Sequence, residues 1–435
     1  MKRICVILLL VLLLPGLLLG AGAALPEYYG ESYYAELPAM VEKLKTTQGP
    51  KIVLVGGSNV AFGVDSALME DLLSQAGESY TVCNFGLYAA VGTSAMLSLS
   101  EKYLNAGDRV VLAIEPTSET FSTYFGATAF WKCAESSPEL LLNVNSSQKS
   151  ALVGNYLAYL QERVEIFRSD ILPQPTDSYA KASFDDSCNM IYDRAGNAMA
   201  LGYDTGNPID LDALTISADF AEQVNGYCRR LKAKGVAVYL SFSPMDRGAM
   251  VSAEEDTMQE FFDLCNRTFD CPVISDPNRY VLDSGWFYDT NFHLNSAGKE
   301  VNTVQLIRDI KAMLGDNREV AVEIPKKPQR TWEDASEKSR IWTKEDSQTY
   351  YGEENIVIPE DVMQIEDNAF SGCTGLKTII LLQKDPSRCI AGQHLLDGTG
   401  AEILVPQGTS DSYKRNYFWS SYAGKIRENT NHAEK

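Results

Sequence analysis

Between residues 51 and 314, short apolar runs alternate with segments of helical periodicity. Lys51–Val55 indicates a buried strand, and the leucines of Ser66–Gln75 are spaced as in a helix. The same alternation predicts strands at Tyr80–Phe85, Arg109–Ile114, Val236–Ser241 and Val273–Ser275, and helices at Ala89–Tyr103, Ala218–Lys234, Ala253–Arg267 and Ala297–Leu314. Strands that alternate with helices imply an α/β fold with a parallel sheet covered on both faces. Reactive groups in such folds gather at the carboxyl ends of the strands.

A Gly56-Gly57-Ser58-Asn59 turn closes the first strand, and His293 lies far downstream, before the last helix. His293 is one of only 3 histidines in the chain. A serine hydroxyl becomes a good nucleophile when an imidazole takes its proton, so Ser58 and His293 form a candidate serine-hydrolase pair. By itself such a turn is more often only a turn, because glycine and asparagine tolerate positive φ.

Three blocks of the chain resemble the SGNH/GDSL hydrolases, in particular the exported members of bacterial cell envelopes: Val55–Ser66, Asn84–Tyr88 and Gly107–Val111. The resemblance covers residues 49–315 and implies a flavodoxin-like three-layer α/β sandwich. It also implies that Ser58 is the nucleophile, that His293 is the base, and that the backbone N–H groups of Ser58 and Gly86 form part of an oxyanion hole. No metal or other cofactor is implied.

Two positions depart from the pattern of these hydrolases. Their Asp-x-x-His becomes Asp289-x-x-x-His293 here, with Thr290 at the usual acid position. Asp289 therefore either reaches His293 from one residue further back or is merely a turn former. After the third strand, Glu115 replaces an asparagine donor of the oxyanion hole. Glu115 either contacts a sugar hydroxyl, repels an oxyanion or only ends the strand, and Asn59 is a further candidate substrate contact.

Three regions that do not follow this alternation suggest additional parts. Residues 117–212 are irregular and predict an insertion that could form a lid or substrate wall. Residues 316–349 are polar and charged, as expected of a linker. The apolar spacing over residues 350–428 resembles a short, β-rich leucine-rich repeat of the BspA-like type, with one or two units and a cap. This module is either a structural appendage or a contact for a protein or the cell wall.

The N-terminus and the overall charge limit where the protein acts and what it binds. Lys2-Arg3, an apolar run from Ile4 to Gly20 and small residues after it predict a signal peptide over residues 1–24, or an uncleaved anchor that would be the only membrane contact. Both place the protein outside the cytoplasm, secreted or at the bacterial cell surface. A net charge of -20 argues against nucleic acid as a partner.

The cysteines are compatible with export. Of 9 cysteines, Cys5 lies in the predicted signal. Cys265 and Cys271 are the first candidate disulfide pair, and free buried thiols are the equal alternative.

Together these features predict an exported serine esterase or O-acyltransferase that acts on an acylated cell-envelope carbohydrate. The alternative is a catalytically weak or inactive carbohydrate-binding or scaffold protein that keeps the same cleft. A third possibility is that the C-terminal module binds a protein partner and the larger domain only displays it.

Overall fold

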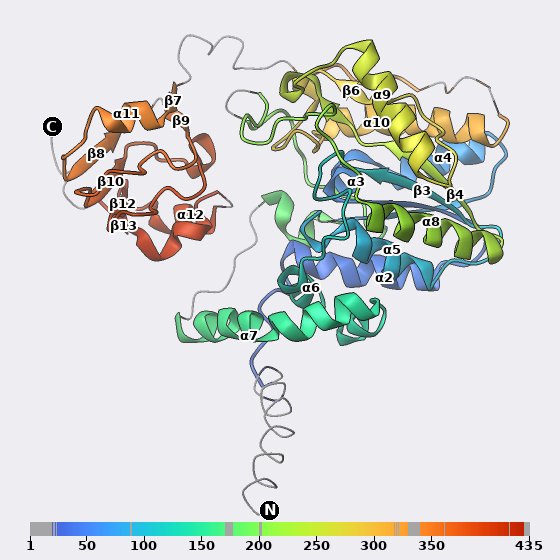
Figure 1. Ribbon diagram of the computed structural model, residues 1–435, viewed down its shortest axis with the longest axis horizontal. Coiled ribbons are helices and arrows are strands. Elements are labelled where there is room, and N and C mark those ends of the chain that lie inside the picture. The colour runs from blue at the N-terminus through green and yellow to red at the C-terminus, as the bar shows by residue number, and fades with distance from the viewer. Residues whose placement is uncertain are drawn as a thin grey trace, which may run out of the picture.

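The structure is a computed structural model of the chain (Figure 1). It describes residues 20, 22, 24–87, 89–169, 177–199, 202–316, 318, 320, 322–328, 340–360, 362–416 and 418–429. The signal peptide or anchor predicted over residues 1–24 therefore lies almost wholly outside the described residues. Within the described part of the chain, we find no helix with both the length and the apolar character needed to span a membrane.

The larger domain is built on a parallel sheet with strand order β2-β1-β3-β4. Its strands are β1 (Lys51–Gly56), β2 (Thr81–Gly86), β3 (Arg109–Ile114) and β4 (Ala237–Phe242). Gly56 stands opposite Gly86 in one neighbouring strand and opposite Ala113 in the other. The carboxyl ends of the three strands therefore meet at one edge, as the sequence predicts. The class, α/β with a parallel sheet, is confirmed.

Helices cover both faces of this sheet (Figure 1). Val53 and Val55 contribute to one core, together with residues of α2 (Glu36–Thr46), α5 (Thr93–Glu101), α8 (Ala218–Ala233) and α9 (Glu255–Thr268). Ile52 and Leu54 point to the opposite face, where α4 (Ser66–Gln75) and α10 (Ser296–Met313) pack. Because alternate residues of β1 enter different cores, the whole strand is buried.

Most predicted elements occur within a few residues of their expected ends, with two differences. The helix expected over Ala89–Tyr103 is divided into a short 3₁₀ turn, Ala89–Val91, and α5. Gly92 causes the break: its φ is +93°, and a Cβ there would lie 2.2 Å from the carbonyl oxygen of Tyr124. The strand expected at Val273–Ser275 is reduced to a single parallel pairing of Val273 with Leu240 in β4.

The irregular segment 117–212 contains the helices α6 (Ala127–Cys133) and α7 (Ser146–Ser169). They pack against each other at the side of the domain (Figure 1). The rest of the segment is mostly loop. Within it, Ala180 pairs with Ser32, Asn189 accepts hydrogen bonds from Ser66 and Tyr179 donates to Asp289. Sequence periodicity did not predict α7, because apolar side chains occur on two of its faces.

The C-terminal module has a different architecture, with two parallel sheets wound from short strands. One sheet joins β8 (Asn355–Ile358), β10 (Thr378–Leu381), β12 (Glu402–Val405) and β13 (Ile426–Glu428); the other joins β7 (Arg340–Trp342), β9 (Val362–Ile365) and β11 (Ile390–Ala391). Strands of the first sheet begin at Asn355, Thr378, Glu402 and Ile426, so they recur at nearly equal intervals. This ladder is longer than the one or two units expected, because the outer strand β13 has only three residues, two of them charged, and gives no apolar pattern.

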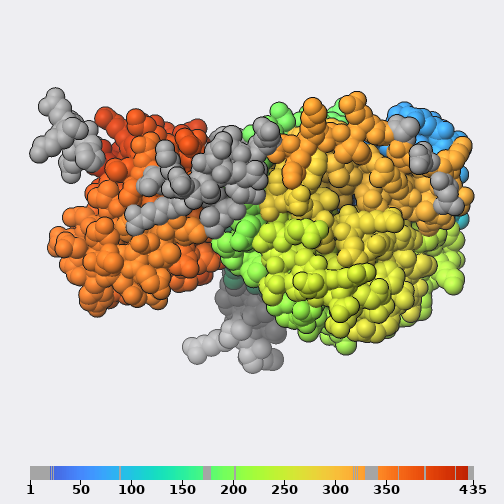
Figure 2. Space-filling view, turned by 90° about the horizontal axis from the view of Figure 1, so that it is seen from above, coloured from blue at the N-terminus to red at the C-terminus, as the bar shows by residue number. Residues whose placement is uncertain are grey.

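The module has a core of its own and forms a distinct body beside the larger domain (Figure 2). Its hydrophobic cluster runs from Trp342 to Ile426. Part of the linker predicted over 316–349 therefore belongs to the module, which begins by Arg340 and includes α11 (Lys344–Gln348). The sequence around Trp342 is polar, so this single buried tryptophan gave no repeating apolar pattern. Val320, at the other end of the predicted linker, packs on the larger domain.

The described cysteines are free thiols and all are buried. The Cys265–Cys271 disulfide that the sequence suggested is not formed. The Cys271 thiol instead has Cys228 of α8 as a neighbour, and this neighbour together with burial raises the pKa of the Cys271 thiol.

Candidate active site

The chain leaves β1 at Gly56, turns at Gly57 and enters α3 (Ser58–Gly63), whose first residue is Ser58. A Cβ at Gly56 would lie 2.4 Å from the carbonyl oxygen of Ala113, so only glycine allows β1 and β3 to approach this closely here. The Ser58 side chain is buried with 6% of its surface exposed. As the first residue of a helix, Ser58 also has a backbone N–H without an intrahelical acceptor.

Gly86 ends β2 beside the same turn. A Cβ on Gly86 would lie 2.4 Å from Val60 Cβ and 2.7 Å from the Gly57 carbonyl oxygen, so glycine is needed for the close approach of β2 to α3. The Gly86 N–H donates to Asn84 Oδ1 at 3.3 Å. The structure therefore brings Gly86 to Ser58, but its N–H is directed at an asparagine side chain of its own strand.

His293 lies in a tight loop whose two sides are paired: the Tyr288 N–H donates to the His293 carbonyl oxygen at 2.8 Å. Within this loop Asp289 Oδ1 lies 2.8 Å from His293 Nδ1. Thr290, at the position where the resemblance leads us to expect the acid, instead accepts the His293 N–H at 3.1 Å. The extra residue in the spacing therefore does not prevent Asp289 from reaching His293. With Nδ1 bonded to Asp289, Nε2 is the ring atom that can take up a proton.

Two aromatic side chains hold this pair in place. The Tyr179 hydroxyl donates to Asp289 Oδ2 at 2.7 Å and lies 3.4 Å from His293 Nδ1. The Phe62 ring stacks on the imidazole with centroids 3.9 Å apart. Phe62 follows Ser58 by four residues on α3, and side chains at this spacing are neighbours on one face of a helix. The stack therefore places His293 beside the turn of α3 that carries Ser58.

Arg194 lies close to Phe62 and is almost wholly buried. Its guanidinium is 4.9 Å from the centroid of the Phe62 ring. Burial lowers the pKa of Arg194 to about 10, and the negative charge of Asp289 opposes that change. Arg194 is therefore still a cation at neutral pH. Its Nε and Nη2 atoms are buried without a hydrogen-bond acceptor among the described residues.

Glu115 follows β3 and turns its carboxyl group to Ser58. Its Oε1 accepts hydrogen bonds from the Ser58 hydroxyl at 3.2 Å and from the Asn59 N–H at 3.0 Å. Burial raises the pKa of Glu115, while the nearby imidazole of His293 and these two donors act in the opposite direction. The position expected to supply an asparagine donor is thus filled by a buried acid that holds the candidate nucleophile.

The Asn59 side chain is used inside the protein. Its Oδ1 accepts the Gly57 N–H at 3.0 Å, and its Nδ2 donates to the Ala113 carbonyl oxygen at 2.9 Å. These two bonds fix the turn that presents Ser58. The expectation that Asn59 contacts a substrate receives no support from this geometry.

The structure thus gathers Ser58, Gly86, Glu115, Asp289 and His293 at one edge of the sheet and adds three residues that sequence reasoning missed. Two of these, Tyr179 and Arg194, come from the segment 117–212, which no motif marked as functional. Phe62 lies inside the Val55–Ser66 block that carries the resemblance, but an apolar residue in a short helix gave no sign of contact with a histidine.

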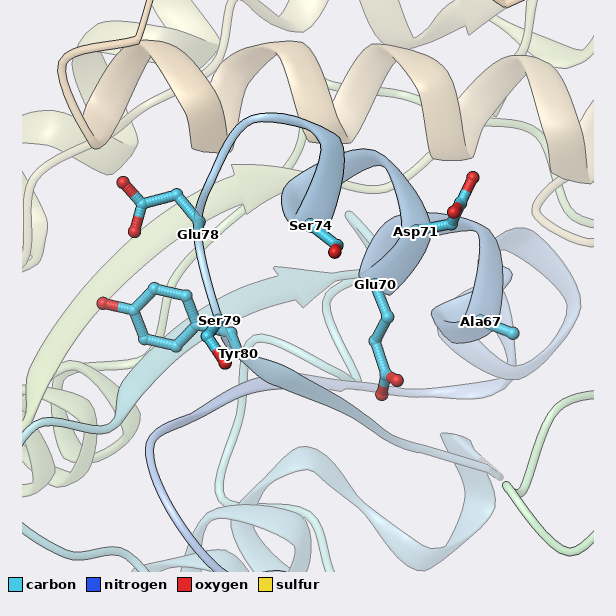
Figure 3. A pocket seen from close by; sticks show the side chains of 7 residues that line it. All are labelled: Ala67, Glu70, Asp71, Ser74, Glu78, Ser79 and Tyr80. Atoms are coloured by element: carbon cyan, nitrogen blue, oxygen red, sulfur yellow. The ribbon is translucent and has the colours of Figure 1, made fainter.

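A hollow of about 420 Å³ lies elsewhere, between α4 and the segment that leads into β2 (Figure 3). It is lined by Ala67, Glu70, Asp71, Ser74, Glu78, Ser79 and Tyr80. Because it lies at the amino end of β2 and Ser58 lies near the carboxyl end of β1, it is not part of the candidate active site. Over the described residues we also find no cluster of three or more histidine, cysteine or acidic side chains placed to hold a metal ion.

Comparison with models of protein families gives no match for this chain. A search of curated proteins likewise finds no similar sequence.

Proposed function

We propose that the protein is a serine ester hydrolase or O-acyltransferase of the SGNH/GDSL type that acts on an acylated carbohydrate outside the cytoplasm. The observation that carries this proposal is the hydrogen-bonded Asp289–His293 pair, stacked on Phe62 one helical turn from Ser58. A nucleophile, a base and an acid that orients the base are the parts that serine hydrolysis requires.

The architecture supports the finer assignments of fold. The order β2-β1-β3-β4, with Val273 paired beside β4, is the strand order of flavodoxin-like sheets. In the C-terminal module, the nearly equal intervals between successive parallel strands agree with the repeat length of leucine-rich proteins.

In the proposed mechanism, the Ser58 hydroxyl attacks the ester carbonyl while His293 Nε2 takes its proton. Asp289, held by Tyr179, keeps the imidazole in the tautomer that has Nε2 free. The Ser58 N–H stabilises the tetrahedral oxyanion, and the Gly86 N–H joins it if it leaves Asn84. His293 then returns the proton to the departing sugar oxygen. Water or a second hydroxyl group takes the acyl group from Ser58 by the same steps in reverse.

Glu115 must be neutral for this mechanism to work well. An ionised carboxylate next to Ser58 would repel the developing oxyanion and would keep the hydroxyl proton away from His293. A protonated Glu115 instead carries an O–H group. Because both donors reach Oε1, that proton resides on Oε2. The neutral carboxyl could then donate to the oxyanion, in place of the missing asparagine amide.

The burial of the site limits the substrate. Ser58 and His293 are each 6% exposed, so the acyl group that reaches them must be small, and acetyl fits this requirement best. With a net charge of -20, the protein does not attract polyanionic polymers, which favours an uncharged carbohydrate as the acyl carrier.

A second function, binding of a carbohydrate without turnover, is favoured by one observation. The Ser58 hydroxyl donates to Glu115 and not to His293. If Glu115 remains ionised at the pH where the protein works, the site keeps its shape and its hydrogen-bonding groups while the nucleophile stays inactive.

Labelling with a fluorophosphonate probe, together with release of nitrophenol from p-nitrophenyl acetate, tests the proposal. Wild type should be labelled and active, whereas Ser58→Ala and His293→Ala should lose both signals and keep their melting temperatures. Ser243→Ala is a matched control, because Ser243 is a buried serine that follows β4 in the same sheet. Equal labelling of wild type and Ser58→Ala would rule out Ser58 as the nucleophile. A folded wild type without label or activity across pH would leave the binding function.

A further inference from the structure

Helix α7 has an apolar stripe that its own domain leaves largely uncovered. Val153, Leu157, Leu160, Val164 and Phe167 recur at the spacing of one helix face. Three of them are strongly exposed, Val153 at 78%, Leu157 at 53% and Phe167 at 61%. A different face of the helix, with Leu152 and Tyr159, is buried against the domain. Leu160, in the middle of the stripe, is buried together with Leu152 and Tyr159, so the uncovered part of the stripe consists of Val153, Leu157 and Phe167 on either side of it.

The segment that follows the N-terminal apolar run is fixed to the middle of this helix. The buried Arg163 of α7 donates to the carbonyl oxygens of Gly22, Leu25 and Pro26 at 2.9, 3.0 and 2.8 Å. Arg163 also forms an ion pair of 3.0 Å with the buried Glu135. These contacts tie the chain to α7 only a few residues after the run ends.

Gly22 lies directly against α7 beside the stripe. A Cβ at Gly22 would come within 2.0 Å of the Tyr156 hydroxyl oxygen and 3.7 Å of Leu160 Cδ1. Leu160 lies between Leu157 and Val164 in the stripe. The point at which the apolar run enters the folded domain is thus next to the exposed apolar residues of α7.

The length of the N-terminal apolar run indicates that a lipid bilayer covers the stripe. Ile4 to Gly20 is close to the ~20 apolar residues that span a bilayer, whose hydrocarbon layer is ~30 Å thick. If the chain retains this run in a membrane, the contacts of Gly22 hold α7 at the lipid surface. The exposed cations Lys149 and Arg168 on α7 suit such a surface, although the protein as a whole is acidic.

We propose that, in the chain that keeps its N-terminal run, α7 lies flat on the lipid bilayer with Val153, Leu157 and Phe167 in the interfacial layer. Side chains in this position enter a bilayer by ~5–10 Å. The domain is then held against the membrane by two attachments, and it cannot turn freely about a single anchor.

Quenching by brominated lipids tests this proposal with the full-length protein. Leu157→Trp, reconstituted in phosphatidylcholine–phosphatidylglycerol vesicles, should lose its added tryptophan emission when the acyl chains are brominated. The native tryptophans are subtracted by measuring wild type in the same vesicles. Val251→Trp is the matched control, because Val251 is also exposed, at 62%, but lies outside α7; its emission should not change.

A second pair of variants separates lipid contact from other causes. Phe167→Trp should also be quenched, and adding Val153→Asp and Leu157→Asp should reduce that quenching several-fold without lowering the melting temperature. Unquenched emission from both Leu157→Trp and Phe167→Trp would overturn the proposal. A second result would overturn it as well: no quenching by brominated lipid, together with concentration-dependent dimers that are lost in Leu157→Asp. In that case a second copy of the protein would cover the stripe.

Discussion

The larger domain and the C-terminal module both consist of parallel strands, but they connect those strands differently. In the larger domain, β1 and β3 are neighbours although β2 and several helices lie between them in the sequence. In the main sheet of the module, each strand pairs with the next strand of that sheet along the chain. The first arrangement brings residues from distant parts of the chain to one edge, where the candidate active site forms. The second repeats similar local contacts and produces a regular apolar core.

This difference predicts that a mutation in the larger domain affects residues far away in the sequence, whereas the effect of a mutation in the module stays within the module.

Asp289→Asn should lower kcat by about 10³–10⁴ and leave KM nearly unchanged, because an amide does not hold the His293 tautomer that has Nε2 free. Steady-state kinetics on p-nitrophenyl acetate provide the measurement. Asp283→Asn, a surface acid six residues earlier that pairs with Lys327 at 3.0 Å, is the control and should retain activity. An unchanged kcat in Asp289→Asn would assign the orienting role to another group.

Trp342→Ala should destabilise the module by about 3–5 kcal/mol, because it removes a large buried side chain from the module's core. Ester cleavage should stay within about twofold of wild type, since Trp342 belongs to the module's own cluster. Thermal denaturation followed with both activity and circular dichroism distinguishes the two parts. If activity were lost at the same temperature at which the module unfolds, the larger domain and the module would fold as one unit.

Glu36→Gln should make the larger domain more stable at pH 8. Burial raises the pKa of Glu36 to about 7 from its ordinary value of 4.5, so between these pH values the folded protein binds a proton that the unfolded chain has released. Wild type therefore loses stability as pH rises through this window, on the order of 2–3 kcal/mol, and the variant does not. Melting curves from pH 4 to 8 should converge at the acid end. Parallel curves would contradict a buried, protonated Glu36.

Glu115→Gln should increase ester turnover at pH 8 about tenfold, because the neutral amide can donate a hydrogen bond to an oxyanion without needing to be protonated. Because burial raises the pKa of Glu115, wild-type activity should fall as pH rises through that pKa, and the variant should lose this decline. The pH dependence of kcat is the measurement. Complete inactivity of Glu115→Gln at every pH would identify the carboxylate as the base for Ser58.

Removal of the module should have the smallest effect of all. A chain that ends after Pro328 should keep its activity and the melting temperature of the larger domain, because Val320 remains packed on that domain and Lys327 on Asp283. A chain that ends after Asp316 serves as the comparison and should be less stable, since it lacks Val320. Aggregation of both chains would show that the module stabilises the larger domain.

The strands of the main sheet and most of the helices that cover it could be predicted from the sequence because their signals are local. Apolar runs and helical spacing fall within short windows of the chain, so they predict the alternation of the larger domain and place Ser58 after its first strand and His293 before its last helix. Glycines also carried information: Gly56 and Gly86 lie where neighbouring strands approach too closely for a Cβ.

The partners of the site residues could not be predicted in this way. Whether Asp289 reaches His293 depends on the shape of one loop, and the approach of Tyr179 depends on the path of the irregular segment 117–212. The hydrogen bond from Ser58 to Glu115 joins residues from two strand ends, and the stack of Phe62 on His293 joins residues from opposite ends of the larger domain's sequence.

The α/β alternation, the regular apolar spacing of the C-terminal part and the candidate chemistry-bearing residues can therefore be predicted from the sequence, because each depends on neighbours along the chain. The contacts among them depend on the tertiary structure: Asp289 bonded to His293, Tyr179 bonded to Asp289, and the buried Glu115 bonded to Ser58. Hydrogen bonds, burial and charge act over a few ångströms in space. Which side chains come within that range is set by the packing of the whole domain.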